Sequence, residues 1–169
     1  MGDNARVKQP TYDEISILPA HARQSVPAAF EDLNGHLNIR HYLGIASEGL
    51  DESLVEVGIP TDWRRTGWAV FSAEHHLAYF SELRTGDEVS VRVRLVGRSE
   101  RAMHVLVYLV DEGRQQVSYA MEEIFLCIDM ETRTTRPWAD DVVALVDAKV
   151  AEHAALPFAA GLSGSMALR

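Results

Sequence analysis

The segment FEDLNGHLNIRHY (residues 30–42) leads directly into the most regular pattern in this sequence. From Ile39 to Val57, apolar side chains recur at three- and four-residue steps, which is the spacing of one helix face. Asn38 is a residue type that caps helix N-termini, and Gly-Ile-Pro at 58–60 contains residues that end helices. This pattern predicts one helix of roughly 30 Å, at about 1.5 Å per residue.

Two glycines, Gly44 and Gly49, lie inside this predicted helix. Each costs about 1 kcal/mol relative to alanine in a helix interior. We therefore expect a tertiary reason for them, such as the close approach of another backbone.

Strand patterns lie on both sides of the helix. Residues 22–31 (ARQSVPAAFE) favour a first strand, with Pro27 placing it at an edge or a bulge. The segment HVLVYLV (104–110) is apolar on both faces, which predicts a central strand or one covered on both sides. The remaining predicted elements are strands at 68–80, 88–96 and 117–129 and an amphipathic helix at 140–156.

This order of elements predicts an α+β fold, in which a curved antiparallel sheet of about five strands wraps around one long helix. A C-terminal helix follows. Because short turns join the strands after the long helix, we expect those strands to be antiparallel neighbours. The 169 residues fit a single domain (1–169), with a core at about 15–150 and flexible termini.

Composition excludes several classes of function. A net charge of −9 argues against nucleic acid as the main partner. No run of eighteen apolar residues indicates a membrane span, and the polar residues 1–10 do not resemble a signal peptide. The single cysteine, Cys127, cannot form an intrachain disulfide and is expected to be a small buried apolar residue. We therefore expect a protein of the reducing cytoplasm.

Arginines gather on one predicted strand and its turn. In 88–96, valines and a leucine alternate with Ser90, Arg92 and Arg94, and Arg98 and Arg101 follow. The interpretation that we favour is a solvated strand face. The alternative is a phosphate site, because arginine forks match phosphate oxygens two at a time.

The residues just before the long helix carry a family resemblance. Asp32, Gly35, His36 and Asn38 resemble the motif of the hotdog-fold acyl-CoA thioesterases, the 4-hydroxybenzoyl-CoA thioesterase-like superfamily. Over residues of about 15 to 150 the chain resembles the branch that includes betainyl-CoA thioesterases, through the segments 18–19, 26–27 and 74–89 and through Ile128, Asp129, Arg133, Arg136 and Pro137. That branch usually carries a threonine two residues before a glutamate in its last strand, where this chain has Ala120 before Glu122.

This resemblance implies a thioester hydrolase whose working carboxylate is Asp32. Asp32 would attack the thioester or act as general base on water, and the sequence does not choose between them. Backbone amides near Asn38 and Ile39, at the positive end of the helix, would polarise the thioester carbonyl. Gly35 would let the substrate approach closely. The competing interpretation is that Asp32 only caps the loop.

Other candidate site residues are less specific. His36 is expected either to orient Asp32 and bind substrate or simply to hold the turn. Glu74 is the second catalytic candidate, beside His75 and His76, and no third ligand at a zinc-like interval supports a metal site. Candidate substrate-binding residues are Trp68 and Tyr79, which with Trp63 and Phe71 would offer a cation–π surface, and Arg92, Arg94 and Arg98.

The expected partner is an acyl-CoA substrate, with no cofactor beyond the coenzyme A that belongs to it. The apolar faces of 104–110 and the free edge of 68–80 predict a homodimer or a dimer of dimers. Two alternatives stay open at this point. One is a non-catalytic acyl-CoA-binding or regulatory protein of the same fold, and the other is a hotdog dehydratase.

Overall fold

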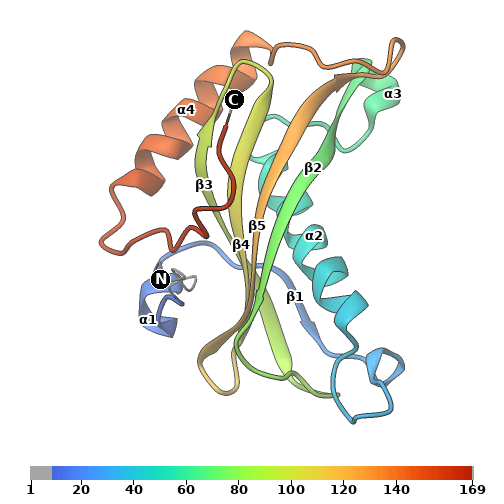
Figure 1. The fold of residues 1–169 in the computed structure, drawn as a ribbon, viewed down its shortest axis with the longest axis vertical. Helices are drawn as coiled ribbons and strands as arrows, with labels where there is room; N and C mark the ends of the chain where they lie inside the picture. The colour runs from blue at the N-terminus through green and yellow to red at the C-terminus, as the bar shows by residue number, and fades with distance from the viewer. Residues whose placement is uncertain (1–8, 169) are drawn as a thin grey trace, which may run out of the picture.

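The computed structural model describes residues 9–168 and confirms the predicted α+β fold, in which five antiparallel strands curl around one long helix (Figure 1). Residues 1–10, which were expected to be flexible and not to form a signal peptide, lie almost entirely outside this range. The elements in chain order are α1 (Tyr12–Ile15), β1 (His21–Ser25), the 3-10 turn η1 (Ala28–Phe30), α2 (Ile39–Val55), α3 (Trp63–Thr66), β2 (Trp68–Tyr79), β3 (Glu88–Arg98), β4 (Ala102–Asp111), β5 (Gln116–Asp129) and α4 (Asp140–Ala154).

Helix α2 begins where the sequence predicted it. The Asn38 side chain accepts a hydrogen bond from the amide of Arg40 at 3.2 Å, which caps the first turn. A Cβ atom at Gly49 would lie 2.3 Å from the Cβ of Val91 on β3, so only glycine lets the helix approach the sheet there. Gly44 has open space around it, so the expected close approach is found at Gly49 alone.

The strand order is β1-β3-β4-β5-β2, and it corrects one prediction. Strands β2 and β3 are consecutive in the chain but are not neighbours. The connection at 80–87 crosses the end of the sheet, because β2 pairs along its whole length with β5 while β1 occupies the side of β3. The first strand is also shorter than predicted: it ends at Ser25, before Pro27.

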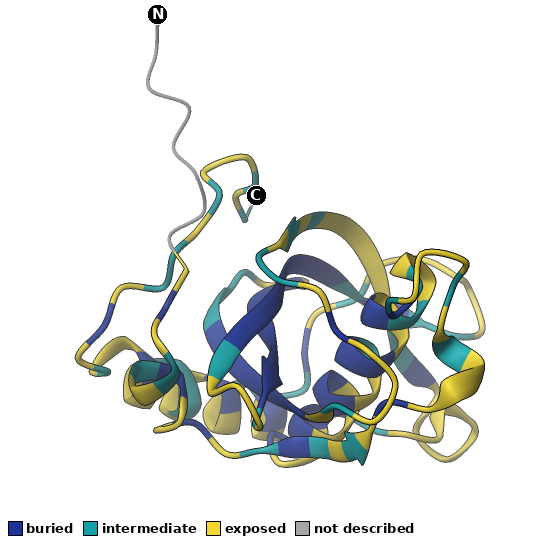
Figure 2. Ribbon diagram, turned by 90° about the horizontal axis from the view of Figure 1, so that it is seen from below, coloured by how far each residue is buried: buried dark blue, intermediate teal, exposed yellow. Residues whose placement is uncertain are grey.

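The sheet is covered on both faces. Its concave face packs on α2, and its convex face is covered by α1 and by the segment after α4, through Ile15, Leu18 and Phe158. β4 is therefore central and buried at all ten residues, as predicted, whereas β2 is mostly exposed at the sheet edge (Figure 2). The argument for a dimer from an uncovered face of 104–110 is wrong, and only the free edge of β2 supports it.

The segments that cover the convex face also bury the face of β3 that was expected to be exposed to solvent, so that prediction is wrong. Arg92 and Arg94 are each only 6% exposed. Arg92 donates to the carbonyl of Leu18 at 2.6 Å, and Arg94 donates to the carbonyls of His153 and Phe158, both at 2.9 Å. The buried guanidinium groups thus hold the chain segments that cover the outer face of the sheet.

Helix α4 protects the part of β3 that β1 leaves unpaired. β1 pairs with β3 only from Glu88 to Val91, and α4 lies beside the remainder (Figure 1). The amide of Leu95 donates to Nδ1 of His153 at 2.8 Å, and Arg98 binds both carboxylate oxygens of Asp147 at 2.7 and 2.6 Å. Within residues 9–168 no helix is long and apolar enough to cross a bilayer.

Candidate active site

The loop between η1 and α2 (residues 31–38), which we call the Asp32 loop, folds back on itself and places Asp32 beside the start of the helix. The amide of Asp32 donates to the carbonyl of His36 at 2.9 Å, and the amide of Asn38 donates to the carbonyl of Phe30 at 2.8 Å. Gly35 adopts a left-handed φ of 77° at the tip, a conformation that favours glycine. Three predicted site residues, Asp32, Gly35 and Asn38, therefore share one tight loop.

The Asp32 carboxylate is half-buried and fixed through one oxygen. Its Oδ1 accepts a hydrogen bond from the amide of Asn34 at 2.8 Å, the turn contact that the loop-capping interpretation expected. Within the part of the chain that the structure describes, Oδ2 accepts no hydrogen bond. The turn contact and a chemical role are compatible, because one oxygen orients the group and the other stays available to a substrate or a water molecule.

Of the backbone amides of Asn38, Ile39 and Arg40 at the start of α2, two already donate hydrogen bonds within the described residues. The amide of Asn38 is occupied by Phe30, and the amide of Arg40 donates to the side chain of Asn38. The amide of Ile39 has no acceptor among residues 9–168, and it points along the helix dipole as its first N–H group. The Ile39 N–H is therefore the free amide at the start of α2 within the described residues.

His36 does not contact the Asp32 side chain. Its Nε2 lies 2.9 Å from Oε2 of Glu82, on the connection between β2 and β3. The pKa of Glu82 is lowered, chiefly by its hydrogen bond with Arg84 and to a smaller degree by His36. In this arrangement His36 fastens the loop to the sheet end, and any orienting effect on Asp32 runs through the backbone.

A cluster of three tyrosines borders the same loop. The ring centroids of Tyr42, Tyr79 and Tyr119 lie 5.1 to 5.5 Å from one another. The amide of Leu83 donates to the Tyr42 hydroxyl at 3.0 Å, and the carbonyl of Leu83 accepts from Leu37 at 2.7 Å. Sequence reasoning identified Tyr79 alone, because the other two come from elements far away in the chain.

Glu74 lies on the face of β2 that points away from α2. It is exposed and paired with Ile124, directly after a bulge in the strand. The inner face carries His75 instead, whose Nε2 is 3.3 Å from Oε1 of the buried Glu123. Ser72 donates to that same oxygen at 2.7 Å. The structure therefore does not bring Glu74 together with Asp32, and it reveals an inner carboxylate, Glu123, that the sequence did not single out.

The four aromatic residues that were expected to form one cation–π surface lie in separate places. Trp68 is buried against Trp138, with ring centroids 6.1 Å apart, at the opposite end of β2 from Tyr79. Trp63 already carries a cation, because the Arg64 guanidinium lies 5.1 Å from the centre of its ring. Phe71 is 41% exposed on β2. Only Tyr79 of the four lies near the Asp32 loop.

The three candidate arginines bind other groups of the protein, and the cysteine is buried. Arg92, Arg94 and Arg98 bind protein groups, which gives their predicted phosphate contacts no support. Cys127 is 1% exposed, and burial raises the pKa of its thiol to about 11, which disfavours the thiolate form. Among residues 9–168 no group of three or more His, Cys, Asp or Glu side chains is arranged to hold a metal.

Comparisons with known proteins found a matching family, a relative in sequence and solved structures of similar fold. The model of the Thioesterase-like superfamily matches residues 26–146. A betainyl-CoA thioesterase of Pseudomonas aeruginosa is 30% identical over 132 residues, which cover 78% of this chain and 83% of that protein. A Staphylococcus aureus protein solved in complex with CoA has a TM-score of 0.78 at 21% identity, covering 99% of this chain and 100% of its own. A 1,4-dihydroxy-2-naphthoyl-CoA thioesterase from Synechocystis has a TM-score of 0.66 at 15% identity, covering 74% and 93%. At these identities the two solved structures establish the shared fold alone.

Proposed function

This chain belongs to the thioesterase-like superfamily and is an acyl-CoA thioester hydrolase, and we propose that its substrate carries a short acyl group with a quaternary ammonium, as in betainyl-CoA. The observation that supports this choice is the 30% identity to a betainyl-CoA thioesterase across most of both chains. None of the relatives supports the non-catalytic alternative.

In the proposed mechanism Asp32 is the catalytic carboxylate. The thioester carbonyl lies against the amide of Ile39, which stabilises the oxyanion that forms on attack. Removal of such a donor costs about a hundred- to a thousandfold in rate. Oδ2 of Asp32 is free to act, while Oδ1 holds the amide of Asn34.

Two routes share this geometry. Asp32 attacks the carbonyl, the CoA thiolate leaves, and water hydrolyses the resulting anhydride. Alternatively, Asp32 takes a proton from a water molecule that attacks the carbonyl directly. A single turnover in ¹⁸O-labelled water tests the first route, because an acid product that carries only unlabelled oxygen requires an oxygen atom from Asp32, which then carries the label.

The proposed enzyme is a homodimer or a dimer of dimers in the cytoplasm, and it needs no cofactor because water is its second substrate. The free edge of β2 supports the assembly, since an unpaired strand invites pairing with a second copy. Three large apolar residues on that edge, Phe71, Leu77 and Tyr79, are 41, 37 and 45% exposed.

The experiment that tests the substrate is a hydrolysis screen over acyl-CoAs, in which a thiol-trapping reagent detects released CoA. The decisive comparison is betainyl-CoA against 3,3-dimethylbutanoyl-CoA, in which carbon replaces the ammonium nitrogen at nearly equal size. We expect faster hydrolysis of the charged thioester. Equal kcat/KM for the two would refute the proposed acyl group while leaving the thioesterase activity intact.

A further inference from the structure

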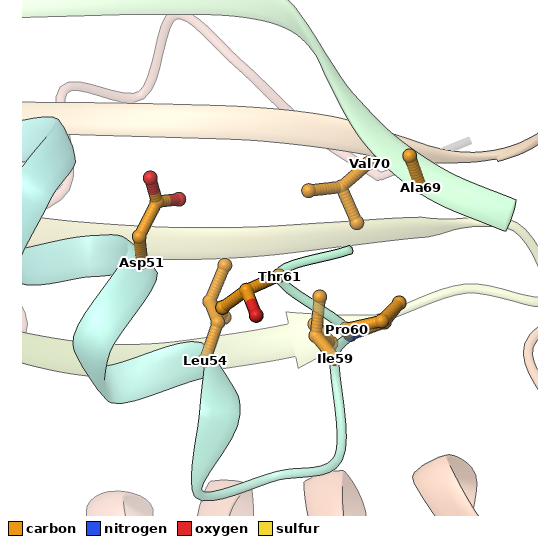
Figure 3. Close-up of a pocket in the computed structure, with 7 residues that line it drawn as sticks. All are labelled: Asp51, Leu54, Ile59, Pro60, Thr61, Ala69 and Val70. Carbon is orange, nitrogen blue, oxygen red and sulfur yellow. The ribbon is translucent and has the colours of Figure 1, made fainter. Parts of the chain in front are cut away.

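A pocket opens between the C-terminal half of α2 and the start of β2. Its volume is about 220 Å³. Figure 3 shows the Asp51 side chain on α2 and the Val70 side chain on β2 at opposite sides of this pocket. The lining residues are Asp51, Leu54, Ile59, Pro60, Thr61, Ala69 and Val70. Asp51 is therefore the one charged residue among those that line the pocket.

Asp51 is exposed to solvent in the single chain, and within the described residues its carboxylate has no counter-ion. In residues 9–168 it makes no hydrogen bond or ion pair, although neighbouring carboxylates on α2 do: Glu48 accepts from Gln24 at 3.3 Å and Glu52 from the amide of Ala22 at 2.7 Å. Partial burial, followed by the charge of Glu48, raises the pKa of Asp51. Both effects would be relieved by a cation in the pocket.

The shape and chemistry of the pocket favour one class of cation. An ammonium or guanidinium with N–H groups needs several acceptors, whereas the lining offers one carboxylate and one side-chain hydroxyl, that of Thr61. A quaternary ammonium has no N–H groups and exposes only methyl groups. It needs one nearby negative charge and contacts with aliphatic side chains, which Leu54, Ile59 and Val70 offer.

We infer that this pocket binds the quaternary ammonium of the acyl group, with Asp51 as the residue that selects for its charge. This inference rests on the proposed function and assigns it a specificity residue. Asp51 would touch the acyl head and take no part in bond breaking.

The pocket serves the Asp32 site of a second copy. Asp51 lies twelve residues after Ile39, about 18 Å along the helix axis, which is too far for a short acyl group within one chain. Antiparallel pairing of two β2 edges about a two-fold axis places the start of each strand beside the end of the other. The pocket borders the start, at Ala69 and Val70, and the Asp32 loop borders the end, next to Tyr79.

The test compares kcat/KM for betainyl-CoA and 3,3-dimethylbutanoyl-CoA in three variants of the full chain. Asp51→Asn is expected to reduce the preference for the charged substrate about tenfold, which is the lower end of the coupling measured for close charge pairs at interfaces. Asp51→Glu should keep part of the preference. Glu56→Gln removes the same charge from the end of α2 without lining the pocket, and it should leave the preference unchanged.

A binding measurement keeps the inference separate from the proposed function. Tetramethylammonium chloride should shift the backbone amide NMR signals of Leu54, Thr61 and Val70 in the parent protein and not in Asp51→Asn. This outcome supports the pocket even if neither thioester is hydrolysed. An unchanged substrate preference in a folded Asp51→Asn variant, or the absence of tetramethylammonium shifts at the pocket, overturns the inference.

Discussion

The amide of Leu83 donates to the hydroxyl of Tyr42 at 3.0 Å, and this bond joins α2 to the connection that supports the Asp32 loop. Leu83 is fully buried, so water cannot accept a hydrogen bond from its amide. The carbonyl of Leu83 accepts a hydrogen bond from the amide of Leu37. The Tyr42 hydroxyl and the Leu37 amide thus bind the two backbone groups of the same residue, which links α2, this connection and the Asp32 loop.

Tyr42→Phe should destabilise the protein by about 1–3 kcal/mol, because it leaves the Leu83 amide buried without an acceptor. It should also lower kcat, since the connection that binds the Asp32 loop through Leu37 loses one of its contacts. Tyr79→Phe is the control from the same cluster, because the Tyr79 hydroxyl makes no hydrogen bond within residues 9–168. Urea unfolding and steady-state rates measure both effects, and equal stability of the two variants would contradict the anchoring role.

Asp32→Asn should lower kcat by about a hundredfold or more, because the amide can neither attack nor accept a proton. KM should change little, since the amide of Ile39 is untouched and the asparagine oxygen can still hold the amide of Asn34. Glu74→Gln, on the other face of β2, should have a smaller effect. A folded Asp32→Asn variant with the parent rate would show that Asp32 is a turn residue only.

Leu77→Lys should weaken the proposed dimer, because a charged residue on an edge strand opposes edge-to-edge pairing. Leu77 lies on β2 and is 37% exposed. Ile17→Lys is the matched control, since Ile17 is 55% exposed in the linker between α1 and β1. Light scattering at micromolar concentration should show a dimer or tetramer for the parent and the control. A monomeric parent protein would rule out the assembly.

Gly49→Ala should destabilise the protein by about 1–3 kcal/mol, because its Cβ would lie 2.3 Å from the Cβ of Val91 and would force α2 away from β3. Gly44→Ala provides the opposite case in the same helix. Its Cβ would find open space, so the higher helix propensity of alanine should add about 0.5–1 kcal/mol. Thermal unfolding that ranks the two variants equally would contradict the close packing at Gly49.

His153 should make stability depend on pH. Burial lowers the pKa of this imidazole, and its neutral Nδ1 accepts the amide of Leu95. The unfolded chain therefore binds the proton more readily than the folded one. The contribution of His153 is fully present above its ordinary pKa of about 6.5 and is lost as the pH falls below that value. Compared with His153→Gln, the parent should lose unfolding free energy between pH 7.5 and 5.5. Parallel curves for the two proteins would exclude this role.

The sequence by itself determined the elements and the chemistry of one loop. The period of the apolar residues gave α2 and the inner strands, because a side chain on a packed face must recur with the period of its element. Asn38, Gly35 and Asp32 could be placed from residue type and spacing alone, since caps and tight turns depend on neighbours within a few residues.

Only the tertiary structure decided which distant segments meet. β2 pairs with β5 and not with β3, the outer face of the sheet is covered by α1 and the residues after α4, and Asp51 faces Val70 across a pocket. Arg92 and Arg94 alternate in sequence as an exposed face would, yet each is buried beneath a different segment that lies more than fifty residues away. Local periodicity records which face of a strand is apolar, whereas the choice of cover depends on contacts between remote parts of the chain.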